Sequence, residues 1–194
     1  MKEPGTIVAC GIVKKELITL AEQHQWNTEL RFLDSSLHTD LGKLYAALDG
    51  SLKMPLVEPV AVVYGTCHPL MRTLLQHHGA YWRMRQNCIE MLLGANEFKK
   101  HIEAGAFFLL EDWAHQWERV TTQALGSNEE LNKYLFRSEH NYILCIHTPC
   151  SGDFTDKATE IERKTGLPLR WLNISLEHFE HYLQNTFDAF GAKE

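Results

Sequence analysis

The sequence lacks the features that mark several large classes of protein. No segment approaches the ~20 consecutive apolar residues that a membrane-spanning helix needs. Lysine and arginine number 19 against 25 acidic residues, and the net charge of −6 argues against a nucleic-acid-binding surface. Neither of the glycine-rich phosphate-binding patterns, GxGxxG and GxxxxGKS/T, occurs. We therefore expect no membrane partner and no nucleic-acid partner, and find no direct sign of a nucleotide cofactor.

The chain also has no CxxC pair, which excludes a zinc ribbon or a thioredoxin-type motif. It begins MKEPGTIVAC, without the apolar stretch of a secretory signal peptide, so we expect a cytoplasmic protein. In that compartment the five cysteines are better interpreted as free thiols, metal ligands or catalytic groups than as disulfides.

Short β-branched runs alternate with amphipathic segments along the whole chain. This alternation predicts an α/β protein: a layered domain with a mostly parallel sheet flanked by helices, spanning residues 1–194 as a single domain. The expected strands are residues 6–12, 29–33, 59–64, 81–84, 106–110, 142–148 and 169–174. The expected helices are residues 13–25, 40–52, 69–78, 87–104, 112–125, 127–136, 155–165 and 176–187.

Local signals suggest where several of these helices begin and end. Asn87 is a plausible N-cap for the long helix that Gly105 ends, and Gly166 ends the helix from residue 155. Ser127 and Glu130 have the spacing of a capping box. His77, with its neighbour His78, is expected on the surface.

Four of the five cysteines follow predicted strands. Cys10 lies at the carboxyl end of the first strand, and Cys67 follows the third in YGTC. Cys88 lies in the first turn of the helix after the fourth strand, and Cys150 follows the sixth. If the strands are parallel, all four thiols lie at the carboxyl edge of one sheet, where α/β proteins bind ligands. Helix N-termini at this edge favour the thiolate form. Cys145, inside ILCIH, is expected to be a core residue.

A cysteine taken alone is more often a packing residue than a reactive one, because free cysteine is among the most buried residue types. Several at equivalent strand ends point instead to a shared site. Thiolates are soft ligands that suit zinc, copper(I) or an iron–sulfur cluster. The thiols at the strand ends could therefore together bind a metal ion such as zinc, or an iron–sulfur cluster.

Five short motifs in this order resemble those of the DUF1638 family of uncharacterised proteins. They are ACG at 9–11, LHTDLGKL at 37–44, YGTC at 64–67, NCIEMLLG at 87–94 and GAFFLLEDW at 105–113. The family pattern differs from this chain at three places, where the chain has Gln86-Asn87, His68-Pro69-Leu70 and Leu110-Glu111-Asp112. Cys10, Cys67 and Cys88 match the family motifs and Cys150 matches none, so the resemblance implies Cys10, Cys67 and Cys88 as the ligands of a metal ion or an iron–sulfur cluster. The resemblance implies little about activity, but such proteins are often found beside corrinoid-dependent methyltransferase systems, which implies a small molecule or a corrinoid-system protein as partner.

The resemblance extends to residues other than the cysteines. His38 matches the family and His68 follows Cys67, so each is a candidate metal ligand or acid–base group. Tyr64 either hydrogen-bonds a ligand or packs with its hydroxyl satisfied. Gly65 permits a tight turn or a close approach of the backbone to a ligand or cofactor. Trp113 matches the family and is a candidate cofactor contact, although packing of an amphipathic helix is the simpler interpretation.

Three functions are consistent with these residues, and the sequence does not decide whether the protein is an enzyme. The first is a thiolate-bound metal or cluster that acts on a small molecule in one-carbon or corrinoid-linked metabolism. The second is a metal-free enzyme in which Cys67 is the nucleophile and His38 or His68 the base, with Tyr64 nearby. The third is a non-catalytic partner or chaperone of a corrinoid methyltransferase system.

Overall fold

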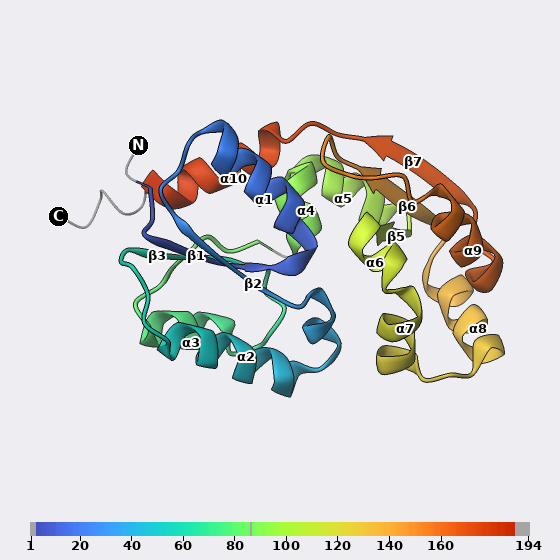
Figure 1. Ribbon diagram of the computed structural model, residues 1–194. Coiled ribbons are helices and arrows are strands. Elements are labelled where there is room, and N and C mark those ends of the chain that lie inside the picture. The colour runs from blue at the N-terminus through green and yellow to red at the C-terminus, as the bar shows by residue number, and fades with distance from the viewer. Residues whose placement is uncertain (1–2, 86, 189–194) are drawn as a thin grey trace. The chain divides into compact units, whose positions relative to one another are not determined.

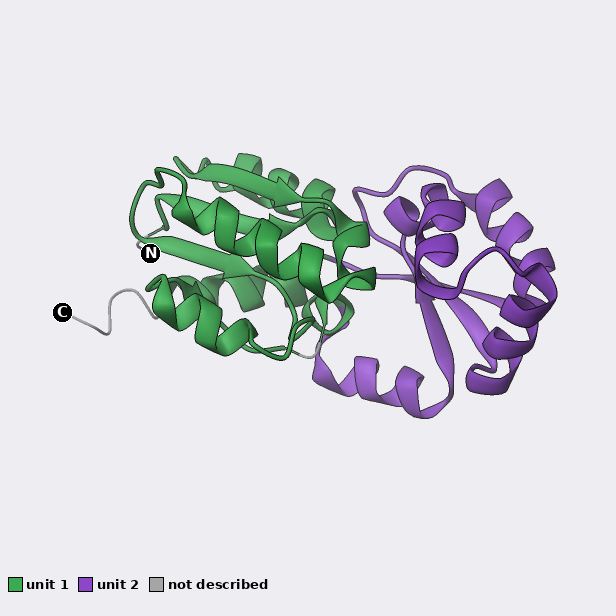
Figure 2. Ribbon diagram, turned by 90° about the horizontal axis from the view of Figure 1, so that it is seen from below, with its two compact units in different colours: residues 1–92, 176–194 green, residues 93–175 purple. Residues whose placement is uncertain are grey.

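The computed structural model describes residues 3–85 and 87–188, and it divides into two compact units (Figure 2). Unit 1 comprises residues 1–92 and 176–194, and unit 2 comprises residues 93–175. Each unit has a parallel sheet of its own. The α/β class with parallel strands flanked by helices is therefore confirmed, but the strands form two sheets where we expected one.

Unit 1 contains a four-stranded sheet in the order β2-β1-β3-β4, with every pairing parallel. Helices α2 and α3 cover one face and α1 and α10 the other (Figure 1). Its elements are β1 (Thr6–Cys10), η1 (Gly11–Val13), α1 (Lys14–Gln23), β2 (Glu29–Leu33), η2 (Ser35–Thr39), α2 (Leu41–Lys53), β3 (Val60–Val63), α3 (Met71–His77), β4 (Tyr81–Trp82), α4 (Cys88–Leu93, whose last residue is assigned to unit 2) and α10 (Glu177–Asp188).

Unit 2 contains a three-stranded parallel sheet in the order β5-β6-β7. Helix α9 packs against α6 and α8. Its elements are α5 (Ala95–Glu103), β5 (Ala106–Leu109), α6 (Glu111–His115), α7 (Trp117–Leu125), α8 (Glu129–Glu139), β6 (Tyr142–His147), α9 (Thr155–Thr165) and β7 (Leu169–Asn173).

The central strands are the ones that the sequence marks most clearly. All residues of β1 and β3 are buried, as is typical of strands covered by helices on both faces. In unit 2 the core forms around Leu109, Trp117, Phe136, Ile143 and Cys145. Burial of these runs supplies the main free energy of folding in each unit.

Two predicted helices are broken. The helix expected over residues 87–104 divides into α4 and α5 at Gly94, whose φ of 75° and ψ of 160° are not helical. The helix expected over residues 112–125 divides into α6 and α7 at Gln116. No helix in the described part of the chain is long and apolar enough to span a membrane.

Candidate functional site

Three cysteines meet at the carboxyl edge of the unit 1 sheet. Cys10 is the last residue of β1, and the register pairs Ala9 with Val63, which brings Cys10 level with Tyr64 just after β3. Cys67 lies in the loop after β3, and Cys88 is the first residue of α4, which follows β4. The strands are parallel neighbours, so three positions far apart in sequence converge, as the sequence predicts.

The thiols of Cys10 and Cys88 are hydrogen-bond partners in a buried setting, with each residue only 6% exposed. Cys67 is half-buried and lies close enough to both for their charges to interact. For Cys88, the bond with Cys10 and then burial raise the thiol pKa. Burial, followed by the charge of Cys10, raises the pKa of Cys67 to about 11. Cys67 and Cys88 therefore both favour the protonated thiol over the thiolate.

The backbone at Gly65 is directed at this cluster of Cys10, Cys67 and Cys88, hereafter the thiol cluster. Its amide hydrogen-bonds the sulfurs of Cys67 and Cys88 and lowers the pKa of each, against the larger effects of burial. Gly65 is itself buried. An amide that donates to sulfur stabilises the thiolate form, which is the form that binds metals. The backbone amide of Gly65 is therefore directed at two of the sulfurs.

Tyr64 is the most unusual residue of the site. It is 1% exposed, and its hydroxyl lies among the three thiols. Burial raises the pKa of Tyr64, and the charges of the thiols raise it further. By strict geometry the hydroxyl has no hydrogen-bond partner among the described residues, but it lies within reach of the Cys10 thiol, and their interaction also raises the Tyr64 pKa. Buried hydroxyls are nearly always paired. Both interpretations open from the sequence, a ligand contact and packing against the thiols, are consistent with this position.

Several hydrogen bonds fix the backbone around the thiol cluster. Trp82 Nε1 donates to the Tyr64 carbonyl at 2.7 Å, and the Thr66 amide donates to the Arg85 carbonyl at 2.9 Å. Asn87 Oδ1 accepts from the Glu90 amide at 3.0 Å, so Asn87 caps α4 as predicted. Its neighbour Gln86, part of the departure from the family pattern, lies outside the described residues. These bonds join the loops that carry Cys67 and Cys88.

The two candidate histidines are bound within their own loops. His38, in η2 after β2, has Nδ1 2.6 Å from the Ser35 carbonyl, which makes Nδ1 the protonated nitrogen and leaves the lone pair on Nε2. Burial lowers the pKa of His38, so the ring is neutral at pH 7, the state that binds metals. His68 Nδ1 accepts the Leu70 amide at 3.0 Å, and its ring packs against Tyr45.

Trp113 and Cys150 belong to unit 2 and not to the unit that carries the thiol cluster. Trp113 packs against the unit 2 core and lies 6.5 Å from Phe107 between ring centroids. Cys150 follows β6, where its amide donates to Thr148 Oγ1 at 3.2 Å. The expectation that Cys150 shares a sheet edge with the other three is therefore wrong, because β6 belongs to a second sheet. Cys145 is fully buried in the core, as expected.

The thiol cluster does not yet have the arrangement of a metal centre. Within residues 3–85 and 87–188, no group of three or more His, Cys, Asp and Glu side chains stands ready to hold a metal ion. Zinc would require its sulfur ligands about 2.3 Å from the ion and hence ~3.8 Å apart. Binding therefore requires a side-chain adjustment, for which Cys67 is best placed because it is half-buried in a loop between two elements.

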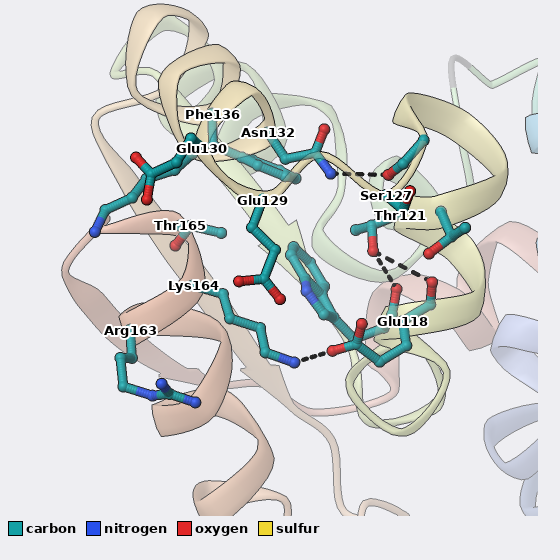
Figure 3. A pocket seen from close by; sticks show the side chains of 14 residues that line it. Glu118, Thr121, Ser127, Glu129, Glu130, Asn132, Phe136, Arg163, Lys164 and Thr165 are labelled. Atoms are coloured by element: carbon teal, nitrogen blue, oxygen red, sulfur yellow. Dashed lines mark hydrogen bonds and ion pairs between the residues drawn. The ribbon is translucent and has the colours of Figure 1, made fainter.

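Unit 2 contains a cavity of about 410 Å³ that the sequence gave no reason to expect (Figure 3). Trp117 and Phe136 contribute its aromatic surface, and Lys164 pairs there with Glu118. Asn132 Nδ2 donates to the Gly126 carbonyl at 3.0 Å. Acidic and basic side chains line the cavity in equal number: Glu118, Glu129, Glu130, Lys133, Arg163 and Lys164. Its lining residues include no cysteine and no histidine.

Fold and site together define an α/β protein with buried thiols at the carboxyl edge of a parallel sheet. A family model described as a protein of unknown function, DUF1638, matches residues 32–183. The chain belongs to the DUF1638 family. Cys67 and Cys88 lie inside the matched residues and Cys10 lies before them. No curated protein and no solved structure matches the chain.

Proposed function

We propose that this protein binds a soft metal ion through Cys10, Cys67 and Cys88 and presents it to a small molecule at the edge of the unit 1 sheet. The observation that carries the proposal is the pair of buried, mutually bonded thiols, Cys10 and Cys88, with Cys67 beside them. The Gly65 amide, which donates to two of the sulfurs, supports thiolate ligation. Zinc is the reference ion because three thiolates leave its fourth position open.

A single ion fits the thiol cluster better than an iron–sulfur cluster does. The Cys10 and Cys88 thiols are already in hydrogen-bond contact. One ion can join two sulfurs that are this close. In a [4Fe–4S] cluster each thiolate binds a different iron atom, which would force the two sulfurs apart.

The alternative of a metal-free nucleophile is less well supported. A cysteine nucleophile needs a thiol pKa below or near the working pH, whereas burial raises the pKa of Cys67 to about 11. The helix after Cys67 begins only at Met71, so its first turn does not lie at the sulfur. A bound cation, by contrast, supplies the positive charge that the thiolates lack.

The metabolic setting is proposed on the family resemblance alone. The resemblance implies one-carbon or corrinoid-linked chemistry, with a small molecule or a corrinoid-system protein as partner. This implication comes from the systems beside which such proteins are found, and it gives no mechanism. The structural observation behind the proposal is the proximity of the three thiols.

The test is metal binding by the full-length chain purified without oxygen. Cobalt(II) reports thiolate ligation through an intense near-ultraviolet charge-transfer band, and its release by zinc gives the relative affinity. We expect one equivalent of metal per chain, with the band lost or strongly weakened in Cys10→Ala, Cys67→Ala and Cys88→Ala. Cys150→Ala is the matched control, since it removes a half-buried thiol at a strand end of unit 2, and it should bind as wild type.

Two results would overturn the proposal. The first is a wild-type chain that binds no cobalt and no zinc at millimolar concentration. The second is a chain that incorporates an iron–sulfur cluster on incubation with iron and sulfide but does not bind either single ion. Equal loss of binding in Cys150→Ala would show that the ligands had been assigned to the wrong thiols.

A further inference from the structure

The cavity of unit 2 is large enough to hold a small molecule. Its volume of about 410 Å³ lies within the range of roughly 300–1,000 Å³ that is usual for small-molecule sites. Helices α7, α8 and α9 form its walls (Figure 3), and all three belong to unit 2. The cavity is therefore a second candidate site, in a different unit from the thiol cluster.

A rigid aromatic pair supplies the apolar surface of the cavity. Trp117 is 7% exposed and Phe136 8%, and their ring centroids lie 5.3 Å apart. Phe107 packs edge-on against both rings, with centroids 5.8 Å from Trp117 and 5.2 Å from Phe136. Aromatic rings held in this way favour contact with an apolar, and especially a planar, group of a ligand.

Some of the charges that line the cavity are balanced within the chain. Lys164 pairs with Glu118, which joins α9 to α7, and with Glu160 at 2.9 Å. Glu130 and Lys133 carry opposite charges about one helical turn apart on α8, so together they add no net charge.

Two further charges at the cavity have no such match. The side chains of Glu129 and Arg163 make no ion pair and no hydrogen bond with any residue that the structure describes. Glu129 begins α8, and Arg163 lies in the last turn of α9. Figure 3 shows them on two sides of the cavity, carried by these two helices. A ligand that carries both charges would match them.

We infer that the unit 2 cavity binds a zwitterionic amino acid with an aromatic or other large apolar side chain. Glu129 binds the ammonium group, and the Arg163 guanidinium binds the carboxylate, for which its planar fork of donors is suited. The side chain of the ligand packs against Trp117 and Phe136. The inference does not depend on the metal site, because it uses no residue of unit 1.

The test is the binding of three phenyl compounds to the metal-free, full-length chain, measured by isothermal titration calorimetry. L-Phenylalanine carries both charges, phenethylamine only the positive one and phenylpropionate only the negative one. We expect the Kd for phenylalanine to be about tenfold or more below that for either of the others, because each of these lacks one charged hydrogen bond.

Two variants assign the charges of the ligand to the two side chains. Glu129→Gln should raise the Kd for phenylalanine and phenethylamine about tenfold and leave that for phenylpropionate within about threefold. Arg163→Gln should raise the Kd for phenylalanine and phenylpropionate and leave that for phenethylamine unchanged. Both positions are exposed, so both variants should fold as wild type, which circular dichroism checks. Glu139→Gln is the matched control, since Glu139 is an exposed glutamate at the other end of α8 that does not line the cavity, and it should bind as wild type.

Three results would overturn the inference. The first is a wild-type chain that does not bind phenylalanine at millimolar concentration. The second is an unchanged Kd for phenylalanine in both Glu129→Gln and Arg163→Gln, which would place the ligand elsewhere. The third is a compound of single charge that binds as tightly as phenylalanine. None of these results bears on metal binding by the thiol cluster, which is measured separately.

Discussion

Packing gives the same side chain different chemical roles in this protein. Cys145 is fully buried in an apolar core, and burial raises its pKa to about 12. Cys10 and Cys88 are also buried, but each has the other as a partner. Cys67 and Cys150 are half-buried in loops after strands. Which thiols can act together is therefore decided by which strands are neighbours in a sheet, and not by residue type.

Thiol alkylation should resolve these environments. In the metal-free protein we expect iodoacetamide to modify Cys67 and Cys150 first, because reagent access follows exposure. Added zinc should protect Cys67 at least tenfold and leave Cys150 unchanged. Peptide mapping by mass spectrometry measures each rate. Modification of Cys145 in the native protein as fast as that of Cys150 would contradict the packing described here.

The residues of the site were predictable to different extents. The convergence of Cys10, Cys67 and Cys88 follows from counting strands and assuming that they are parallel. Cys150 carries the same local signal, a cysteine just after a buried strand, but its strand pairs in another sheet. The Gly65 amide and the buried Tyr64 hydroxyl were not predictable, because both depend on atoms that only the folded chain brings together.

Elements were easier to locate than to delimit. Helix α9 and its left-handed cap at Gly166, with φ of 70°, lie where predicted. The break at Gly94 was missed because one glycine inside a strongly periodic segment is compatible with a continuous helix. The cap of α8 was also wrong by one residue: Asn128, not Ser127, accepts the Leu131 amide, at 3.0 Å. Neighbouring residues compete for such caps, and sequence alone does not rank them.

The α8 cap gives a paired test. Asn128→Ala should lower the free energy of unfolding by about 1 kcal/mol, because the Leu131 amide loses its acceptor. Ser127→Ala, one residue earlier, should change it by only a few tenths of a kcal/mol. Urea unfolding measures both. A larger effect of Ser127→Ala than of Asn128→Ala would restore the capping box that the sequence suggested.

An ionic link joins α2 to the end of α3. Asp49 accepts from Lys53 at 2.6 Å and lies 2.9 Å from His78 Nε2, so His78 is less exposed than the sequence suggested. The bond with Lys53, and then that with His78, hold the Asp49 pKa below its usual value. The folded state therefore releases this proton more readily than the unfolded state does, and the link is complete only above the unfolded pKa of ~3.9.

This link should make stability depend on pH in the acidic range. As the pH falls through the lowered pKa of Asp49, the contribution of the ionised carboxylate is lost, so the free energy of unfolding should decrease more steeply for wild type than for Asp49→Asn. Urea unfolding between pH 2.5 and 6 provides the comparison. Asp156→Asn, at an exposed carboxylate of α9, is the control. Parallel curves for wild type and Asp49→Asn would contradict the prediction.

At the scale of the whole molecule, the proposed metal ligands all lie in one unit. Cys10, Cys67 and Cys88 all belong to unit 1, which the chain completes with α10 after it leaves unit 2. This division was not predictable, because the buried runs of β3 and β6 look alike in sequence. Which strands pair with each other also depends on residues that are far apart in the chain. The sequence predicts a single domain over residues 1–194, and this stays a prediction.

Metal binding should therefore stabilise the two units unequally. A ligand that binds only the folded state increases the protection of backbone amides against hydrogen exchange in the part of the chain that binds the ligand. We expect zinc to slow amide hydrogen exchange in β1, β3 and α4 of unit 1 and to leave β6 and α9 of unit 2 within twofold of the metal-free rates. Hydrogen exchange read by mass spectrometry measures both sets of peptides. Protection confined to unit 2 would contradict the assignment of the ligands.

The most direct measurement of the central claim is X-ray absorption at the zinc edge of the zinc-loaded, full-length protein. The account predicts three sulfur ligands at about 2.3 Å, reduced to two in Cys67→Ala and unchanged in Cys150→Ala. A first coordination shell of nitrogen and oxygen atoms alone would contradict it.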